Sequence, residues 1–344
     1  MRYVYVLVLL AIGAGARCGS TTDSTVEHGA PVSVTVDTLV GLQDDTASVI
    51  GTPHWVGSSA TGTLFVVDNS DRNIKLYDAS GRRTATIGRS GEGPGEFMSL
   101  MSAGFLGDSM LGYDFVRGIA TVFTPEGEAS RTLRFAPAPW AVRAFDDSLL
   151  IAVYHPAQRR NLIQLLRRDG TVERAFFDVP ADMARFPEVP ANSVLWLDSF
   201  DDVIFAAFFG DDRVFALSPD GRTIATLQLE VPRFADVAAQ HEGKLRSGTV
   251  WHQHGLRTIM QVVALEDSTV AIQTAAYDTE LGTDRVEGGE LLIARLQGDA
   301  LEITARRTVS VGLFGHDVSG APLGLGYSDA VGGRYFLARF SLAR

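Results

Sequence analysis

The sequence has a single cysteine, only two lysines and no Gly-x-Ser-x-Gly segment. The lone cysteine, Cys18, excludes a disulfide within the chain. Beyond the first residues, no apolar run reaches the roughly 18 residues that a membrane-spanning helix needs. The missing Gly-x-Ser-x-Gly elbow and the terminal position of Cys18 disfavour nucleophilic hydrolysis. A disulfide scaffold, a polytopic membrane protein and a serine or cysteine hydrolase are therefore all disfavoured.

The charge balance is acidic, with 41 Asp and Glu against 30 Lys and Arg and a net charge of −11 at pH 7. A body of this charge is not drawn to nucleic acid or to anionic lipid. We therefore predict no nucleic-acid partner, and no motif indicates a cofactor. The 344 residues, 46% of them hydrophobic, are enough for a large core.

The N-terminal segment has the features of an export signal. Met1-Arg2 supplies a charge, the segment 3–13 is apolar, and Ala14-Gly15-Ala16 fits the small-x-small rule of signal peptidase. We predict a signal peptide over residues 1–17 and a polar tether over 18–30. Removal of Arg2 and Arg17 would take the net charge from −11 to −13.

Cys18 stands where a lipoprotein signal places its acylated residue. The residue before it is Arg17, although the lipoprotein peptidase normally needs a small residue there. Two alternatives stay open. The protein is a periplasmic or outer-membrane-attached lipoprotein, whose only membrane contact is the lipid anchor, or it is secreted with one free thiol.

A repeat unit organises the rest of the chain. Each copy ends in a turn with glycine, and the glycines are spaced by 43 to 77 residues. The closing turns are Asp78-Ala79-Ser80-Gly81, Thr124-Pro125-Glu126-Gly127, Arg167-Arg168-Asp169-Gly170, Ser218-Pro219-Asp220-Gly221 and the looser Gln297-Gly298-Asp299. A period in the forties or low fifties is typical of a four-stranded β-propeller blade.

The strands of the unit indicate burial between blades. A strand with alternating apolar residues precedes each turn, and a nearly continuous apolar run such as Leu64-Phe65-Val66-Val67 lies upstream of it. We predict an all-β fold, a six-bladed β-propeller of antiparallel blades, as one domain over residues 31–344. Five blades are traced at about 51–97, 98–135, 138–180, 192–231 and 258–309. The sixth joins a C-terminal strand within 323–342 to an N-terminal strand at 32–36, which closes the ring.

The first unit carries a more specific signal. Val67-Asp68-Asn69 is followed by Arg72-Asn73-Ile74-Lys75-Leu76-Tyr77-Asp78 and then by the glycine-rich linker Gly88 to Phe97. Over residues 62–97 this resembles the NHL repeat and the bacterial six-bladed propellers related to it. The resemblance implies a scaffold rather than an activity.

The linker glycines Gly91, Gly93 and Gly95 admit a second interpretation, a phosphate cradle. No helical pattern follows them and Pro94 interrupts the run. A structural crossing between blades is therefore favoured.

Two insertions interrupt the period, at about 231–255 and 277–289. The first is predicted to begin with a short helix over 235–245. It holds His252-Gln253-His254, whose imidazoles could chelate Zn²⁺ or Cu²⁺ with His241 as a third ligand. Solvated histidines are the favoured alternative. Asp68, Asp71, Asp114, Asp211 and Asp212 could bind calcium, but short side chains in such loops more often hold tight turns.

Residues at the starts of the innermost strands should line the central channel. These are His54, Trp55, Trp140, Arg143, Trp196, Gln261 and Tyr327. Aromatic rings and a guanidinium would suit a sugar or a peptide. The alternative is that the tryptophans only fill the spaces between blades. Our candidate ligand-binding residues are His54, Trp55, Arg143, Trp196, Gln261, His252 and His254.

Three functional hypotheses follow. The first is an exported, non-enzymatic binding or scaffold module for a peptide, glycan or protein, with its ligand on the face that carries the loops. The second is a metal-dependent hydrolase of the lactonase type, although His54, Arg143 and Gln261 do not form the set of acids it needs. The third is a lyase of the NHL-propeller type. The first is favoured because no coherent catalytic set is present.

Overall fold

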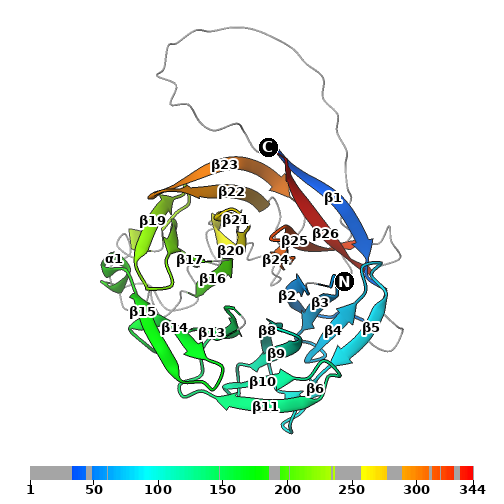
Figure 1. Cartoon of the computed structure of the whole chain (residues 1–344). Helices are drawn as coiled ribbons and strands as arrows, with labels where there is room; N and C mark the ends of the chain where they lie inside the picture. Colours follow the sequence, from blue (N-terminus) through cyan, green and yellow to red (C-terminus); the bar gives the residue numbers. More distant parts are fainter. Residues whose placement is uncertain are drawn as a thin grey trace, which may run out of the picture.

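The structure is a ring of six β-sheets arranged around a central axis (Figure 1). It is a computed structural model and describes residues 33–43, 49–59, 61–146, 148–185, 194–200, 202–233, 235–236, 257–276, 289–309, 312–317, 319–328 and 334–343. Every sheet of the ring has four antiparallel strands. The fold is therefore the six-bladed β-propeller that the repeat predicts.

The first three blades follow one another along the chain, with their strands numbered outward from the centre. Blade 1 consists of β2 (Pro53–Ser58), β3 (Leu64–Asp68), β4 (Asn73–Tyr77) and β5 (Arg83–Ile87). Blade 2 consists of β8 (Leu100–Leu106), β9 (Ser109–Asp114), β10 (Ile119–Phe123) and β11 (Ala129–Arg134). Blade 3 consists of β12 (Ala141–Ala144), β13 (Leu149–Val153), β14 (Asn161–Arg167) and β15 (Val172–Asp178).

The remaining three blades complete the circle. Blade 4 consists of β16 (Leu195–Phe200), β17 (Val203–Phe208), β18 (Arg213–Leu217) and β19 (Thr223–Gln228). Blade 5 consists of β20 (Arg257–Leu265), β21 (Thr269–Ala276), β22 (Gly289–Gln297) and β23 (Ala300–Val309). Blade 6 consists of β24 (Gly312–His316), β25 (Pro322–Ser328), β26 (Arg334–Ala343) and β1 (Ser33–Gly41).

Blade 6 closes the ring with strands from both ends of the chain, as expected. Strand β1 pairs antiparallel with β26, from Ser33 opposite Ala343 to Gly41 opposite Phe336. One expectation about this blade is wrong. Tyr327 lies in β25, the second strand, because the innermost strand is the glycine-rich β24, which has no long apolar run to announce it.

The closing turns explain why the repeat glycines recur. Gly81, Gly127, Gly170 and Gly221 all have φ between +80° and +88°, a region that other residues enter only with strain. Each of these glycines lies between the third and fourth strands of its blade. At Gly221 a Cβ atom would also approach the Cβ of Phe176 to 2.7 Å. The turn therefore fixes both the reversal of the chain and the spacing to the neighbouring blade.

The core lies between the blades. Strand β17 is buried along its whole length, as its continuous apolar sequence predicts. Strand β10, which was expected only to alternate, is also buried at every position. Residues of neighbouring blades share hydrophobic clusters, for example Leu111 of blade 2 with Leu150 and Leu166 of blade 3. Each blade therefore depends on its neighbours for burial.

The glycine-rich linker is a crossing between blades 1 and 2. Two short strands, β6 (Arg89–Ser90) and β7 (Glu96–Phe97), pair in parallel within it, and Phe97 is fully buried. The Glu96 carboxylate accepts the N–H of Gly93 at 2.7 Å and an N–H from Arg89 at 2.8 Å. These two donors hold the pKa of Glu96 below its usual value. The carboxylate of Glu96 therefore takes the backbone and side-chain donors that a bound phosphate would need in this loop.

The aspartates of the first two units hold the chain at the entrance of each inner strand. Asp68 accepts the backbone N–H groups of Gly51, Thr52 and Ser70 at 2.9 to 3.0 Å. In the same position of blade 2, Asp114 accepts those of Met98, Ser99 and Arg117. The predicted turn role is confirmed for both residues.

Buried charge accompanies Asp68. The ammonium of Lys75 is fully buried and donates to Asp68 at 2.5 Å, to Asp71 at 2.8 Å and to the carbonyl of Val49 at 2.7 Å. Burial alone would raise the pKa of Asp68, but hydrogen bonds from Lys75, Thr52 and Gly51 outweigh it and lower the pKa.

Asp211 and Asp212 behave differently from Asp68. Their carboxylates bind the side chains of Arg213, Arg233 and Gln228, and Asp211 also accepts the backbone N–H of Asp212. The same two arginines, Arg213 and Arg233, bind Asp182 in the short helix α1 (Ala181–Ala184). Burial raises the pKa of Asp211. These ion pairs attach α1 to blade 4, which is a role that the turn prediction for the two aspartates did not include.

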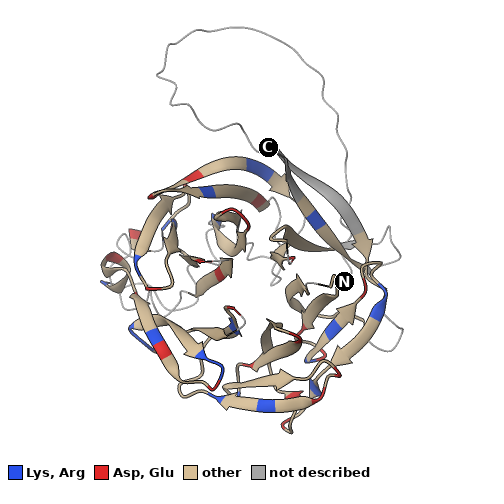
Figure 2. Cartoon of the chain, in the orientation of Figure 1, with Lys and Arg blue, Asp and Glu red and all other residues tan. Residues whose placement is uncertain are grey.

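Charged residues of both signs are distributed around the outer strands and turns of the ring (Figure 2). No helix in the part of the chain that the structure describes is long and apolar enough to span a membrane. The helix expected over 235–245 lies outside the described residues apart from its first two positions. Most of the 231–255 insertion, residues 277–288 of the second insertion, the signal peptide and the tether also lie outside them, so the domain boundaries stay predictions.

Candidate functional site: the central cavity

A cavity of about 110 Å³ lies at the centre of the ring. We call it the central cavity. Five of the six blades contribute to it, through their innermost strands or the residues next to them. Its lining residues are His54, Met101, Trp140, Ala141, Arg143, Val153, Leu195, Trp196, Leu197 and Gln261. The lining therefore combines two indole rings with an amide, an imidazole and a guanidinium.

Arg143, on β12 of blade 3, reaches two other blades. Its guanidinium carbon lies 3.6 Å from the centroid of the Trp55 ring, which belongs to blade 1. Its Nη1 donates to the carbonyl oxygen of Leu197 in blade 4 at 2.8 Å and lies 3.8 Å from Asp198 Oδ1. Burial lowers the pKa of Arg143, and the charge of Asp198 opposes that shift. One side chain thus crosses the centre of the ring.

Asp198 continues the contacts to blades 5 and 6. Its Oδ2 accepts the N–H of Ala264 at 3.0 Å and lies 3.5 Å from Nε2 of His316. The His316 ring packs edge-on against Phe200, with centroids 5.6 Å apart. Trp55, Arg143, Asp198 and His316, here named the central network, together join blades 1, 3, 4, 5 and 6. The axis of the propeller is thereby spanned by polar side chains beside the cavity.

Two hydrogen-bond donors of residues that line this cavity have no partner in the part of the chain that the structure describes. Seven buried side-chain nitrogen or oxygen atoms of the described residues lack a hydrogen bond, and Nε of Arg143 and Nε1 of Trp196 are two of them. An unpaired buried donor costs about 1–3 kcal/mol. Such groups in a native structure call for an explanation.

The structure brings together five of the residues expected in the channel. His54, Trp140, Arg143, Trp196 and Gln261 all line the central cavity. Trp55 is buried and contacts Arg143 through its ring. His252 and His254, also candidate ligand-binding residues, and the lipidation candidate Cys18 lie outside the described residues.

The tryptophans also fill spaces between blades, which was the alternative interpretation. Trp140 packs edge-on against Phe115 of blade 2, with ring centroids 5.3 Å apart. Trp55 belongs to a hydrophobic cluster shared by several blades. The two roles coexist, since an indole has two faces and an edge.

Sequence reasoning missed Met101, Asp198 and His316. Met101 and Asp198 also lie on inner strands, β8 and β16, and the rule that selected Trp196 could have found them. His316 ends β24, whose innermost place was not recognised.

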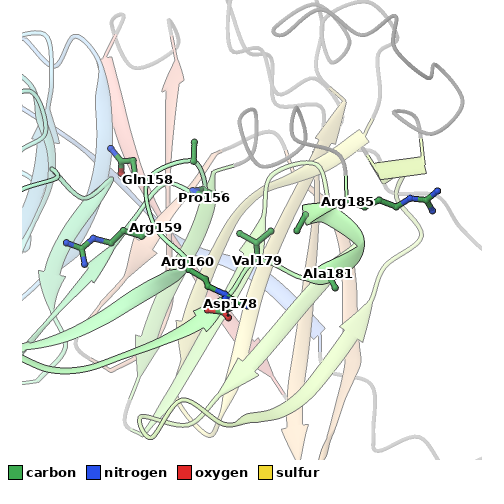
Figure 3. A pocket seen from close by; sticks show the side chains of 10 residues that line it. Pro156, Gln158, Arg159, Arg160, Asp178, Val179, Ala181 and Arg185 are labelled. Atoms are coloured by element: carbon green, nitrogen blue, oxygen red, sulfur yellow. Dashed lines mark ion pairs between the residues drawn. The ribbon is translucent and has the colours of Figure 1, made fainter.

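A second, larger cavity of about 660 Å³ lies at the rim, between the loop that follows β13 and helix α1. We call it the rim cavity (Figure 3). Arg160 lies against Asp178, 3.3 Å away, while Arg159 and Arg185 point to opposite sides of the cavity. Its charged groups do not converge, so the smaller central cavity is the better candidate site.

Carboxylates and histidines do not gather into a metal site in the described part of the chain. No group of three or more His, Cys, Asp or Glu side chains with suitable spacing occurs among those residues. At the central network only Asp198 and His316 come together. The donor set expected of a lactonase-type site is therefore not found among these side chains.

Comparison with known proteins agrees with the architecture. Residues 42–105 match the model of the family DUF5128, described as a 6-bladed beta-propeller. No curated protein is significantly similar in sequence.

Among solved structures, a Bacteroides fragilis protein inferred to be exported superposes with a TM-score of 0.65 at 10% identity, over 90% of this chain and 96% of that one. A Bacteroides vulgatus member of the DUF4221 family superposes with a TM-score of 0.61 at 9% identity, over 91% and 99% of the two chains. The virginiamycin B lyase of Staphylococcus aureus is more distant, with a TM-score of 0.48 at 12% identity over 90% and 100%. The chain is thus a six-bladed β-propeller that resembles Bacteroides proteins in fold, with a partial match to the 6-bladed beta-propeller family.

Proposed function

We propose that the protein is an exported, non-enzymatic binding module, and that its central cavity receives one residue-sized group of a peptide, a glycan or a partner protein. The observation that carries the proposal is the set of lining residues. Two indole rings, an amide and a guanidinium from three blades converge on one small space. Rings stack on sugars and apolar side chains, and a guanidinium binds oxygen acceptors.

The size of the cavity limits what enters it. About 110 Å³ is well below the range of roughly 300–1,000 Å³ that is usual for sites enclosing a whole small molecule. A single side chain, a chain terminus or part of a sugar ring would fit. The rest of the ligand would then lie over the face that carries the loops, where rigid scaffolds commonly place recognition residues.

The export part of the proposal rests on the N-terminal sequence. Its charge, apolar stretch and Ala14-Gly15-Ala16 site fit a secretory signal. The Bacteroides fragilis protein with the same fold, inferred to be exported, is consistent with this. Fractionation of cells that express the full chain, with and without Cys18→Ala, would separate the anchored form from the secreted form.

Tryptophan fluorescence tests the binding part, because three of the four tryptophans lie at the cavity or against Arg143. The full chain would be titrated with pooled tripeptide amides that cover all side-chain classes, and with mono- and disaccharides. We expect at least one saturable titration, with recovered probes chemically intact by mass spectrometry. Trp140→Ala should weaken it at least fivefold.

Arg160→Ala, at the rim cavity, is the matched control and should leave the titration unchanged. If no probe binds, or if Trp140→Ala and Arg160→Ala have equal effects, the central cavity is not the binding site. Conversion of a bound probe to a product would contradict the non-enzymatic character.

A further inference from the structure

The guanidinium of Arg143 has one edge in use and one edge without a partner. Nη1 donates to Leu197, and one face of the group lies on the Trp55 ring. Nε makes no hydrogen bond among the described residues, although it is buried. The Nε and Nη2 hydrogens point in parallel, which is the edge that binds a carboxylate with two hydrogen bonds.

A second residue with an unpaired donor, Trp196, lines the same cavity. The indole Nε1 of Trp196 is buried and has no partner among the described residues. An indole N–H can only donate, and so can a guanidinium. Both groups therefore require an acceptor, and neither can satisfy the other.

The carboxylate already present does not fill this need. Asp198 faces the other edge of Arg143, with Oδ1 3.8 Å from Nη1, and its Oδ2 accepts the N–H of Ala264. The contacts of Asp198 and Leu197 hold Arg143 in place, as does the Trp55 ring. A donor held in advance loses little conformational freedom when it binds a ligand.

The rim cavity shows that an unpaired arginine is not enough by itself. Arg159 also has an unpartnered Nε, and its guanidinium lies 4.4 Å from the centroid of the Tyr154 ring. No second buried unpaired donor lines that cavity among the described residues. The central cavity differs because two unpaired donors share one small space.

We propose that the central cavity is a carboxylate-binding site, in which the Nε–Nη2 edge of Arg143 and the indole N–H of Trp196 hold the two oxygens of one ligand carboxylate. The proposal deepens the proposed binding function and rests on it. An acidic side chain, a peptide C-terminus or a uronic acid each presents this group at a size suited to about 110 Å³. The neighbouring Trp140 ring would cover the carbon atoms next to it.

Matched probes distinguish these sources. We would titrate the full chain with acetyl-Ala-Glu-Ala-amide, its Gln counterpart, the Gln peptide with a free C-terminus, and glucuronate against glucose. Measurement at about 0.15 M salt limits the long-range repulsion that the acidic protein exerts on every anion. Tryptophan fluorescence and the melting temperature would both be followed, because a ligand that binds only the folded state raises that temperature.

We expect one carboxylate probe to bind at least tenfold more tightly than its neutral match. Arg143→Lys should abolish this preference, since an ammonium lacks the planar pair of donors. Trp196→Phe keeps a ring and leaves the central network intact, so it remains informative if Arg143→Lys does not fold. This substitution should lower the affinity of the protein for the carboxylate probe about tenfold and hardly change its affinity for the neutral probe.

Arg159→Lys is the matched control, an arginine with an unpaired Nε outside the cavity, and should change nothing. If charged and neutral probes bind equally well and Trp140→Ala still weakens both, the binding function stands and the carboxylate site is overturned. If neither these probes nor the pooled ones bind, both proposals fail. A carboxylate preference that survives Trp196→Phe and Arg143→Lys would place the site elsewhere.

Discussion

Two cations of this protein, the fully buried Lys75 and the half-buried Arg143, differ in how completely they are paired. Lys75, in blade 1, has three acceptors, two of them carboxylates, within 2.8 Å. Arg143, at the centre of the ring, has one hydrogen bond within 2.8 Å, a carboxylate at 3.8 Å and an unpaired Nε. The first arrangement fills every donor of the ammonium and can serve structure alone. The second leaves a hydrogen-bond donor of Arg143 unused in a residue that lines a cavity. The Lys75 cluster is therefore structural, whereas the surroundings of Arg143 are a candidate binding site.

The largest expected effect is on stability, from Lys75→Met. The change leaves Asp68 buried without its cation, and breaking a buried pair in this way costs about 3–5 kcal/mol. Urea denaturation would measure the free energy of unfolding. A loss below about 1 kcal/mol would mean that Asp68 is satisfied by its backbone donors alone.

Low pH should destabilise the protein through the ion cluster of Lys75 and Asp68. The pKa of Asp68 is lowered in the folded state, so its contribution to stability is present above the unfolded value of about 3.9 and is lost as the pH falls through the folded value. Asp68→Asn should therefore lower stability at neutral pH and flatten its decline below about pH 4. Denaturation at a series of pH values measures both.

The exposed counterpart is Asp78, where the hydroxyl of Ser80 and the N–H of Arg82 lower the pKa to about 2. Asp78→Asn should flatten the loss of stability below about pH 4 less than Asp68→Asn does, because solvent screens the contacts of the Asp78 carboxylate. The opposite order would show that burial of the Lys75 cluster does not control acid stability.

Arg143→Met should cost far less than Lys75→Met, about 1 kcal/mol. The variant loses one hydrogen bond and the contact with the Trp55 ring, together worth about 1–3 kcal/mol, but it also removes an unpaired buried donor of comparable cost. The same urea experiment compares the two methionine variants directly. Equal losses would assign Arg143 a structural role like that of Lys75.

The smallest expected effect is from Trp196→Phe, within about 0.5 kcal/mol of the original protein. The lost ring contacts are offset by removal of an unpaired buried N–H. Ligand affinity should fall in the same variant. A loss of stability without a loss of affinity would make the indole a packing residue only.

Particular residues show how far sequence reasoning reaches. Gly81, Gly127, Gly170 and Gly221 predicted the closing turns correctly because positive φ is a local requirement that glycine meets. The continuous apolar runs predicted buried strands for the same kind of local reason. The innermost strand of blade 6 was missed, since β24 reads Gly-Leu-Phe-Gly-His and has neither signal.

The candidate site was predicted only in part. The rule that residues at the starts of the innermost strands line the channel selected five residues that do line one cavity: His54, Trp140, Arg143, Trp196 and Gln261. That rule could not show that Arg143 reaches Trp55, because the two residues belong to blades that are not neighbours. Nor could it distinguish Asp68 from Asp211, which binds Arg213 two residues along the chain but also Arg233 from the segment after β19.

The sequence by itself determined most of the strands, the closing turns and the number of blades, because alternation, apolar runs and glycine positions act over a few residues and repeat. Only the tertiary structure decided which polar groups are satisfied. Lys75 meets its acceptors within its own blade and the segment before it, whereas Arg143 is placed by contacts from blades 1 and 4. Pairing at the centre depends on closing the ring, and ring closure leaves Nε of Arg143 and Nε1 of Trp196 as unpaired donors beside one cavity.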